Sequence, residues 1–428
     1  DNLILPAQAI FNAKTVLGVI EAEIADATDA MAIRKVAVTH LSAARKAGMT
    51  AIADALRADP FSARPMTRSY TYLTDCLVEA AFLVASKILH PLSNPTEQER
   101  IALIAVGGYG RGEMAPQSDV DLLFLTPYKV TPWAESVIES MLYILWDLRL
   151  KVGHASRTVR DCIRLGGEDF TIRTAMLEHR YLTGDMPLAQ ELETRLWDEL
   201  FAGSSREFIE AKLEEREIRH DKQGQRYVVE PNIKEGKGGL RDLQSLFWIA
   251  KYVHGVQTVS ELVTVGVFNE DDLVTFRDAE SFLWAVRGHL HLIANRPMEQ
   301  LTFDMQVEVA SQMGYVDVRG RRGVEIFMQD YFRHATAVGD LTRIFLTKLE
   351  AMHAKNEPLL QRIFRRRPRM KQGYTVVHGR LALADPEEFL NDKLNILRLY
   401  EEALRTGMLI HPDAMLLVKA NLPLIDDE

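Results

Sequence analysis

The spacing of apolar residues changes along this chain from helical to strand-like and back to helical. Residues 7–57 and 67–88 carry apolar side chains three and four positions apart, which predicts two or three helices followed by another. Pro60 and Pro65 separate these two parts. The pattern after Asp169 is again mostly helical, with predicted helices over 169–182, 187–219, 239–254, 270–295, 304–313, 321–353, 386–405 and 412–420.

A short stretch between the helical parts has the pattern of buried strands. Residues 101–106 form an apolar run closed by two glycines, and residues 120–125 form a second run. Continuous apolar runs of this length are typical of strands covered on both faces. An amphipathic helix is predicted over 133–150 and a third strand over 151–157. This order of elements indicates a small α/β domain.

The predicted organisation has three segments, which is consistent with a length of 428 residues. We expect an N-terminal helical segment over 1–64, an α/β domain over 65–185 and a mostly helical domain over 186–428. The predicted fold class is therefore α/β plus all-α.

Composition excludes several classes of protein. The chain is 47% hydrophobic and has a net charge of −9, which is typical of a globular protein and not of a basic nucleic-acid binder. Its two cysteines, Cys76 and Cys162, lack metal-site spacing and fit a reducing compartment. The apolar runs are too short to span a bilayer, and the first residues do not have the pattern of a signal peptide. We therefore expect a cytoplasmic protein with no nucleic-acid or membrane partner.

The candidate chemistry lies between the two apolar runs. Four glycines within six positions let backbone N–H groups approach a phosphate group without hindrance from a Cβ atom. If a helix begins there, its N-terminus adds positive potential. These glycines are Gly107, Gly108, Gly110 and Gly112. Arg111 within the turn is either a phosphate contact or part of a structural salt bridge, and Ser118 is predicted to donate to phosphate or bond the backbone.

Asp119 and Asp121 come directly after this turn, at the start of the second run. Residues two apart on a strand project from the same face. Paired carboxylates suit Mg²⁺ (or Mn²⁺), which completes its coordination with water and substrate phosphates. A DxD pair alone is most often two solvated acids, and a glycine cluster alone is most often a turn. Their combination favours a catalytic metal site, because a carboxylate inside an apolar strand is costly unless it binds something.

Two other nucleotide-binding patterns do not fit. No Lys-Ser/Thr follows the glycines, as a Walker A loop requires. A dinucleotide fold expects an acid about twenty residues beyond the glycines, whereas here the acids follow after about ten.

The motif resembles the polymerase-β-type nucleotidyltransferase superfamily. More narrowly, the segments 107–113, 118–123 and 152–158 resemble the family of uridylyltransferase/uridylyl-removing enzymes of bacterial nitrogen regulation, which modify the PII signal protein. The segment 230–244, EPNIKEGKGGLRDLQ, is the most family-specific part. The resemblance covers the chain beyond its N-terminal helices.

This resemblance implies a polymerase-β-like domain with a helical associated domain, and uridylyl transfer from UTP to a tyrosine of the PII protein. It also implies that a full-length chain continues into an HD-type hydrolase domain and ACT sensor domains, which lie outside this sequence. Adenylyl transfer of the glutamine-synthetase type, or a nucleotide-binding regulatory module without turnover, remain alternatives. The sequence does not decide between uracil and adenine.

The segment 230–242 is a second candidate anion-binding turn, because glycines and cations precede a helix. The resemblance favours Lys234 and Arg241 as nucleotide contacts, although a solvated loop is the alternative. Asp242 either pairs with a cation or caps the helix. A third metal-binding acid, common in the superfamily, is absent from 151–157, and Asp147 is more typical of a solvated residue.

Overall fold

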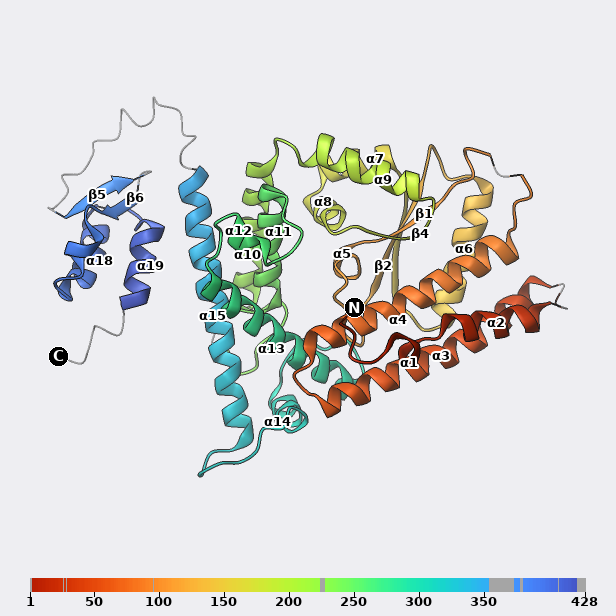
Figure 1. Ribbon diagram of the computed structural model, residues 1–428, viewed down its shortest axis with the longest axis horizontal. Helices are drawn as coiled ribbons and strands as arrows, with labels where there is room; N and C mark the ends of the chain where they lie inside the picture. Colours follow the sequence, from red (N-terminus) through yellow and green to blue (C-terminus); the bar gives the residue numbers. More distant parts are fainter. Residues whose placement is uncertain are drawn as a thin grey trace. The chain divides into compact units, whose positions relative to one another are not determined.

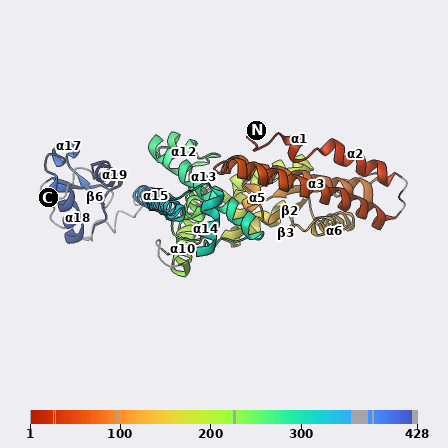
Figure 2. The same ribbon diagram turned by 90° about the horizontal axis from the view of Figure 1, so that it is seen from below.

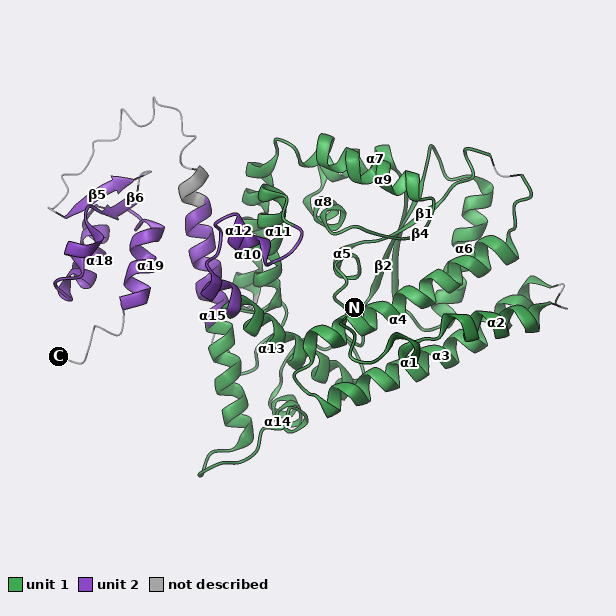
Figure 3. Ribbon diagram, viewed as in Figure 1, with its two compact units in different colours: residues 1–256, 275–336 green, residues 257–274, 337–428 purple. Residues whose placement is uncertain are grey.

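The computed structural model describes residues 2–25, 27, 29–94, 96–223, 228–353, 373–377, 380–406 and 408–421 (Figure 1). The chain divides into two compact units (Figure 3). The first comprises Asp1–Val256 and Thr275–Thr336, and the second comprises Gln257–Val274 and Ala337–Glu428. The fold class predicted from the sequence is confirmed, whereas the three predicted segment boundaries stay a prediction.

The first unit begins with helices, as the apolar spacing predicts. These are α1 (Ala7–Ile10), α2 (Ala13–Ile24), α3 (Ala30–Ala58) and α4 (Ala63–Leu83), and α4 continues into the π-helical turn η1 (Val84–Leu89). Asn12 and Asp29 cap α2 and α3 by accepting backbone N–H groups of their first turns. Helix α3 runs alongside α2 and α4 (Figures 1 and 2).

A four-stranded mixed sheet follows in the order β3-β2-β1-β4. Its strands are β1 (Ala102–Ala105), β2 (Val120–Thr126), β3 (Val152–Thr158) and β4 (Arg180–Gly184). Strand β1 is antiparallel to both of its neighbours, and β2 is parallel to β3. The β2–β3 register places Asp121 directly beside Gly153. The three strands predicted from the sequence are thus present.

Helices cover both faces of the sheet, so the central strands are apolar on both sides. Leu103, Leu122 and Phe124 are buried in a core shared with α4 and with α6 (Pro132–Asp147). The opposite face contacts α9 (Met186–Arg195), while α7 (Val159–Glu168) packs against β3. Figure 1 shows these two layers on either side of the strands. The two aspartates lie at the N-terminal end of β2.

Three predicted helices are divided in the structure. The helix expected over 386–405 forms two helices, over residues 386–389 and 394–406. The helix expected over 169–182 ends as α8 (Phe170–Leu177), and β4 follows it. The segment expected as one helix over 187–219 forms α9, the π-helical turn η2 (Leu196–Phe201) and α10 (Ser205–Gln223). The prediction was wrong at β4 because this edge strand buries only Leu182 fully and lacks an apolar run.

Further helices follow, with bounds α11 (Leu240–His254), α13 (Glu270–Ala294), α14 (Phe303–Gln312) and α15 (Gly323–His353). Residues 270–274 of α13 and 337–353 of α15 are assigned to the second unit. The loop before α11 is tied to the segment between α13 and α14. Ile233 N donates to Glu299 O at 2.9 Å, and Leu301 N donates to Pro231 O at 2.9 Å. These backbone bonds fix the loop over residues 230–239 in place.

The second unit includes α12 (Glu261–Thr264) and a hairpin of β5 (Tyr374–Val377) and β6 (Arg380–Leu383). Three helices, α17 (Pro386–Phe389), α18 (Leu394–Thr406) and α19 (Pro412–Asn421), accompany the hairpin. Leu381, Phe389, Leu399 and Val418 form a small separate core. No helix in the described part of the chain is both long and apolar enough to cross a bilayer.

Candidate active site

The glycine turn forms a single helical turn, α5 (Gly107–Gly110), directly after β1. Gly107 has φ +59° and Gly112 has φ +75°, a region that side-chain-bearing residues rarely adopt. Gly110 is required for a different reason: a Cβ there would collide with the carbonyl oxygen of Glu178. The backbone is therefore left-handed at Gly107 and Gly112, and Gly110 packs closely against the segment that connects α8 to β4.

Arg180, at the start of β4, binds the backbone of this turn. Its guanidinium donates to the carbonyl oxygens of Tyr109 at 3.2 Å and Gly110 at 3.3 Å. The same group forms a bidentate pair with Asp75 on α4, at 2.9 and 3.0 Å. Gly110 N and Gly112 N donate to the carbonyl oxygens of Val106 and Tyr109, at 3.0 and 3.1 Å. Among the four glycines of the turn, only Gly107 and Gly108 have N–H groups without a backbone acceptor in the described residues.

Asp119 and Asp121 lie at the N-terminal end of β2. Asp119 is exposed and immediately precedes the strand, whereas Asp121 is half-buried within it. The Asp121 carboxylate lies between the glycine turn and β3: a Cβ at Gly107 would be 3.5 Å from its Oδ2, and one at Gly153 would collide with its Oδ1. The sheet thus places the Asp121 carboxylate beside the glycine turn, which is the candidate phosphate-binding segment.

Charges around Asp121 act in opposite directions. Burial raises the pKa of the Asp121 carboxyl above its usual range, and Asp119 raises it further, while Lys234 lowers it. Lys234 is more than one hundred residues away along the chain, so the loop over 230–239 comes to the carboxylate pair in space. The second predicted anion-binding turn thus carries a charge that acts on the first.

The three cations predicted to contact nucleotide are not equivalent. Arg111 pairs with Glu113 at 2.8 Å and with Glu178 at 2.5 Å. Arg241 pairs with Glu235 at 3.2 Å. Both guanidinium groups also lie over the ring of Trp248, at 5.9 and 5.2 Å. These contacts favour structural roles for both arginines.

Lys234, in contrast, forms no ion pair with any residue that the structure describes. Burial lowers the pKa of its ammonium group, and the charges of Arg287 and Arg241 lower it further. The charges of Glu299 and Glu235 act in the opposite direction on this pKa. Of the three cations, Lys234 is thus the one without an ion pair among the described residues, and its charge acts on Asp121.

Asp242 anchors the loop that carries Lys234. It is 1% exposed and accepts a hydrogen bond from Gly238 N at 2.9 Å. Arg219 and His220 of α10 also donate to its carboxylate. Gly238 itself has φ +79° and packs against the backbone of Ala335 in α15. Asp242 thus both pairs with cations and binds the backbone just before α11.

Three further polar residues near the sheet have clear places. The Ser118 hydroxyl accepts from Ala115 N at 2.9 Å, so it is engaged by the backbone. The rings of His154 and Trp146 make an edge-to-face contact, with their centroids 6.4 Å apart. His154 is therefore on the α6 side of the sheet, away from Asp121. Asp147 pairs with Arg34 of α3 at 2.8 Å and is half-exposed. Neither His154 nor Asp147 joins the carboxylate pair.

The donor set at this edge is limited to two carboxylates. Among the residues described, no group of three or more His, Cys, Asp or Glu side chains could hold a metal ion. Magnesium is often held by only one or two carboxylates together with substrate phosphates. Asp119 and Asp121 therefore fit a Mg²⁺ that arrives with a nucleotide, and do not form an all-protein cage.

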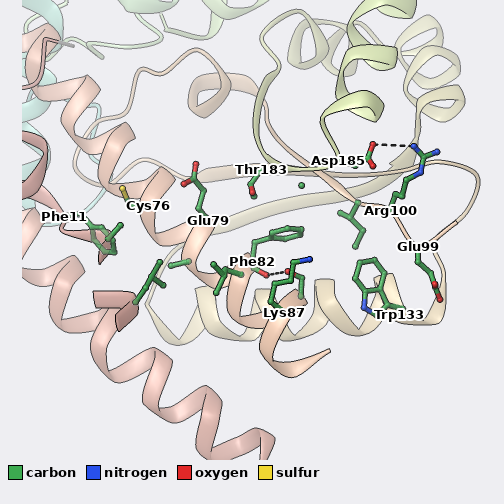
Figure 4. Close-up of a pocket in the computed structure, with 17 residues that line it drawn as sticks. Phe11, Cys76, Glu79, Phe82, Lys87, Glu99, Arg100, Trp133, Thr183 and Asp185 are labelled. Carbon is green, nitrogen blue, oxygen red and sulfur yellow. Dashed lines mark hydrogen bonds and ion pairs between the residues drawn. The ribbon is translucent and has the colours of Figure 1, made fainter. Parts of the chain in front are cut away.

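A separate pocket of about 560 Å³ lies between α4, η1 and the end of β4 (Figure 4). It carries charges of both signs, and its Arg100 pairs with Asp185 at 3.5 Å. None of its lining residues belongs to the glycine turn, the carboxylate pair or the loop over 230–239. We therefore do not assign it to the candidate active site.

Sequence reasoning missed several residues that shape this site. Gly153 leaves room for the Asp121 carboxylate, Arg180 holds the turn, and Glu178 pairs with Arg111. Only Gly153 had an available signal, since it lies in the third strand predicted from the sequence. The other two act through contacts between distant parts of the chain.

Two family models match the chain. Residues 92–180 match the nucleotidyltransferase domain, and residues 207–346 match the GlnD PII-uridylyltransferase model. The first match contains the glycine turn and both aspartates, and the second contains Lys234 and Arg241. The two sequence segments that meet at Asp121 thus fall in separate family models.

Curated relatives agree with these matches. The chain is 68% identical to the bifunctional uridylyltransferase/uridylyl-removing enzyme of Ruegeria pomeroyi, over 98% of this chain and 46% of that protein. It is 61% identical to the protein of the same name from Cereibacter sphaeroides, over 100% of this chain and 46% of that protein. Identity to the Rhodospirillum rubrum protein is 49%, over 83% and 38%. The chain spans about half the length of these relatives.

Proposed function

Because this chain belongs to the family of bifunctional uridylyltransferase/uridylyl-removing enzymes, we propose that it catalyses metal-dependent transfer of a uridylyl group from UTP to a tyrosine of the PII signal protein. The observation that carries this proposal is the position of the Asp121 carboxylate. It lies between Gly107 and Gly153, beside Asp119 and within the electrostatic reach of the unpaired Lys234.

Each part of the site has a role in this reaction. Gly107 and Gly108 give the triphosphate access to backbone N–H groups. The N–H groups of Gly110 and Gly112 donate within the turn, where Gly110 allows close packing and Gly112 allows a left-handed backbone. Lys234 neutralises phosphate charge directly. Arg111 and Arg241 instead stabilise the surrounding segments through their ion pairs with Glu178 and Glu235. The Ser118 hydroxyl holds the bend that leads into Asp119.

Asp119 and Asp121 would hold Mg²⁺ (or Mn²⁺), which when bound lowers the negative charge on the phosphates and activates the attacking oxygen. The phenol oxygen of the protein substrate forms a bond to the α-phosphorus of UTP, and the bond to the pyrophosphate oxygen breaks. The phenol proton passes to solvent, since none of the residues described around Asp121 is placed to act as a general base. The products are uridylyl-tyrosine and pyrophosphate.

Two alternatives make different predictions. An adenylyltransferase would use the same glycine turn and aspartates but prefer ATP. A regulatory module would bind nucleotide without turnover. The match of residues 207–346 to the uridylyltransferase model favours UTP, and the presence of both aspartates beside an unpaired lysine favours turnover.

The decisive experiment measures pyrophosphate release by this chain with PII protein and either UTP or ATP, in the presence of Mg²⁺. We expect release with UTP, and a loss on the order of a hundredfold or more in Asp119→Asn and Asp121→Asn. Asp147→Asn is the matched control, because Asp147 pairs with Arg34 away from the site. Faster release with ATP would favour the adenylyltransferase, and binding without release would favour the module.

Partners and location follow from the same proposal. UTP and the PII protein are the expected substrates, and the hydrolase and sensor domains are expected in the longer relatives. The two cysteines form no disulfide in the described part of the chain, which is compatible with a reducing cytoplasm. That location stays a prediction.

A further inference from the structure

A second, smaller pocket lies behind the segment that leads into Asp119. Its volume is about 80 Å³, several times the roughly 10–15 Å³ that holds one water molecule. Its walls come from α3, α4, the segment over 114–118 and the turn over 149–151 before β3. It has room for one small polyatomic ion, but not for a nucleotide.

The charges of this pocket are all of one sign. Arg45, Arg149 and Lys151 line it, and no acidic residue does. None of these three side chains forms an ion pair with any residue in the described ranges. Arg45 is half-buried, and burial lowers the pKa of its guanidinium without any opposing acid. Three cations without a counter-charge make the pocket attractive to an anion.

A buried hydroxyl group supplies an independent observation. Tyr70 lines the pocket and is 3% exposed, yet its hydroxyl has no hydrogen-bond partner among the described residues. Leaving such a group unsatisfied is costly, so native structures rarely do so. Burial also raises the pKa of the Tyr70 phenol, which keeps it protonated as a donor. An oxygen acceptor in the pocket would satisfy it.

We propose that this pocket binds a small oxyanion of the phosphate class, held by Arg45 and the Tyr70 hydroxyl with Arg149 and Lys151 at its mouth. The site is distinct from the triphosphate cradle because none of its lining residues is a glycine of the turn or Lys234. Gln117 and Ser118 form one of its walls, and Val120 N donates to Lys151 O at 2.8 Å. Its occupant therefore lies against the backbone that presents Asp119.

The test is calorimetric titration of the whole chain with inorganic phosphate in the presence of EDTA, with sulfate and acetate as further probes. We expect phosphate and sulfate to bind, and acetate to bind less tightly because it offers fewer acceptor oxygens. Tyr70→Phe and Arg45→Gln should each weaken phosphate binding by about tenfold or more, since each removes one donor to a charged group. Lys46→Gln is the matched control, because Lys46 is an exposed cation next to Arg45 and does not line the pocket.

Two additional measurements test where phosphate binds and what the Tyr70 hydroxyl contributes. In Lys234→Ala, the phosphate binding that depends on Tyr70 and Arg45 should remain, because Lys234 does not line the pocket. Only phosphate bound in the triphosphate cradle should be weakened, which distinguishes the two sites. Without phosphate, Tyr70→Phe should unfold at a temperature equal to or above that of the parent chain, because the Tyr70 hydroxyl has no partner to lose. Phosphate should raise the unfolding temperature of the parent chain but raise that of Tyr70→Phe much less. Absence of phosphate binding by the parent chain overturns the proposal. So does equal affinity in the parent and both pocket variants, or an equal loss in Lys46→Gln.

Discussion

Lys234 is the residue of the loop over 230–239 whose charge reaches the candidate active site. Its charge lowers the pKa of Asp121 while it forms no ion pair with a described residue. We expect Lys234→Ala to lower kcat/KM for UTP by about 10- to 100-fold, because a charged hydrogen bond to phosphate is lost. Steady-state kinetics would measure this.

The control for that variant is Lys237→Ala, which removes a positive charge from the same loop. If the loop acts only through its overall charge, both variants lose activity equally, and the direct role of Lys234 is refuted. If neither variant changes kcat/KM, the loop over 230–239 is a scaffold only.

Gly153 gives a second test at the scale of one residue. A Cβ at this position would collide with Oδ1 of Asp121, so Gly153→Ala should displace the carboxylate with little effect elsewhere, because position 153 is exposed. Displacements of this kind cost about tenfold or more in rate. Gly167→Ala, where a Cβ meets nothing within 4 Å, should retain full pyrophosphate release. Full activity in Gly153→Ala would mean that Asp121 does not need its present position.

At this scale the sequence predicted the chemical groups better than their partners. The glycines and both aspartates are adjacent in sequence, and a local pattern is enough to find them. The two interpretations of Arg111 could not be separated, because its partner Glu178 lies 67 residues away. The orphaned hydroxyl of Tyr70 could not be found either, since an unsatisfied group is defined only by everything packed around it.

At the scale of elements, β1, β2 and β3 were predicted and β4 was not. Strand β4 pairs only with β1 and lies at one edge of the sheet. Leu182 is its only buried residue, and the strand follows a short helix without a strong turn signal. Edge strands of this kind are specified by the neighbouring strand to which they bond, which local spacing does not reveal.

Strand β4 nevertheless supports the active site through Arg180. We expect Arg180→Met to lower the rate of pyrophosphate release by about tenfold, because the carbonyl groups of Tyr109 and Gly110 lose their donor and the turn gains freedom. Arg180→Lys should not restore the rate, since one ammonium group cannot also reproduce the bidentate pair with Asp75. Kinetics of both variants would be compared with those of Arg206→Met, an exposed arginine on α10.

The outcome against this role would be a normal rate in Arg180→Met with a lowered unfolding temperature alone. That result would make Arg180 a purely structural residue. Restoration by lysine would instead show that its charge matters and its fork geometry does not.

At the scale of the whole molecule, helices distant in sequence are joined by charges that burial makes sensitive to pH. Glu280 on α13 pairs with Arg64 on α4 at 3.1 Å. Burial, together with the charge of Glu113, raises the pKa of the Glu280 carboxyl to about 7, while Arg64 and Arg111 oppose the increase. Helix α13 is thereby linked to the charges around the glycine turn.

A carboxyl group with a raised pKa binds its proton more tightly in the folded state than in the unfolded one. Its contribution to stability is fully present below the ordinary pKa of 4.5 and is lost as the pH rises through about 7. Glu280→Gln removes this titration, because the amide stays neutral at every pH. We expect the variant to have a free energy of unfolding about 2–3 kcal/mol higher than the parent chain at pH 8, and an equal one near pH 4. Denaturant unfolding across this range would measure the difference, with the exposed Asp278→Asn on the same helix as the control. A constant difference between parent and variant from pH 4 to pH 8 would show that the pKa of Glu280 is the same in the folded and unfolded chain, and would refute its increase by burial.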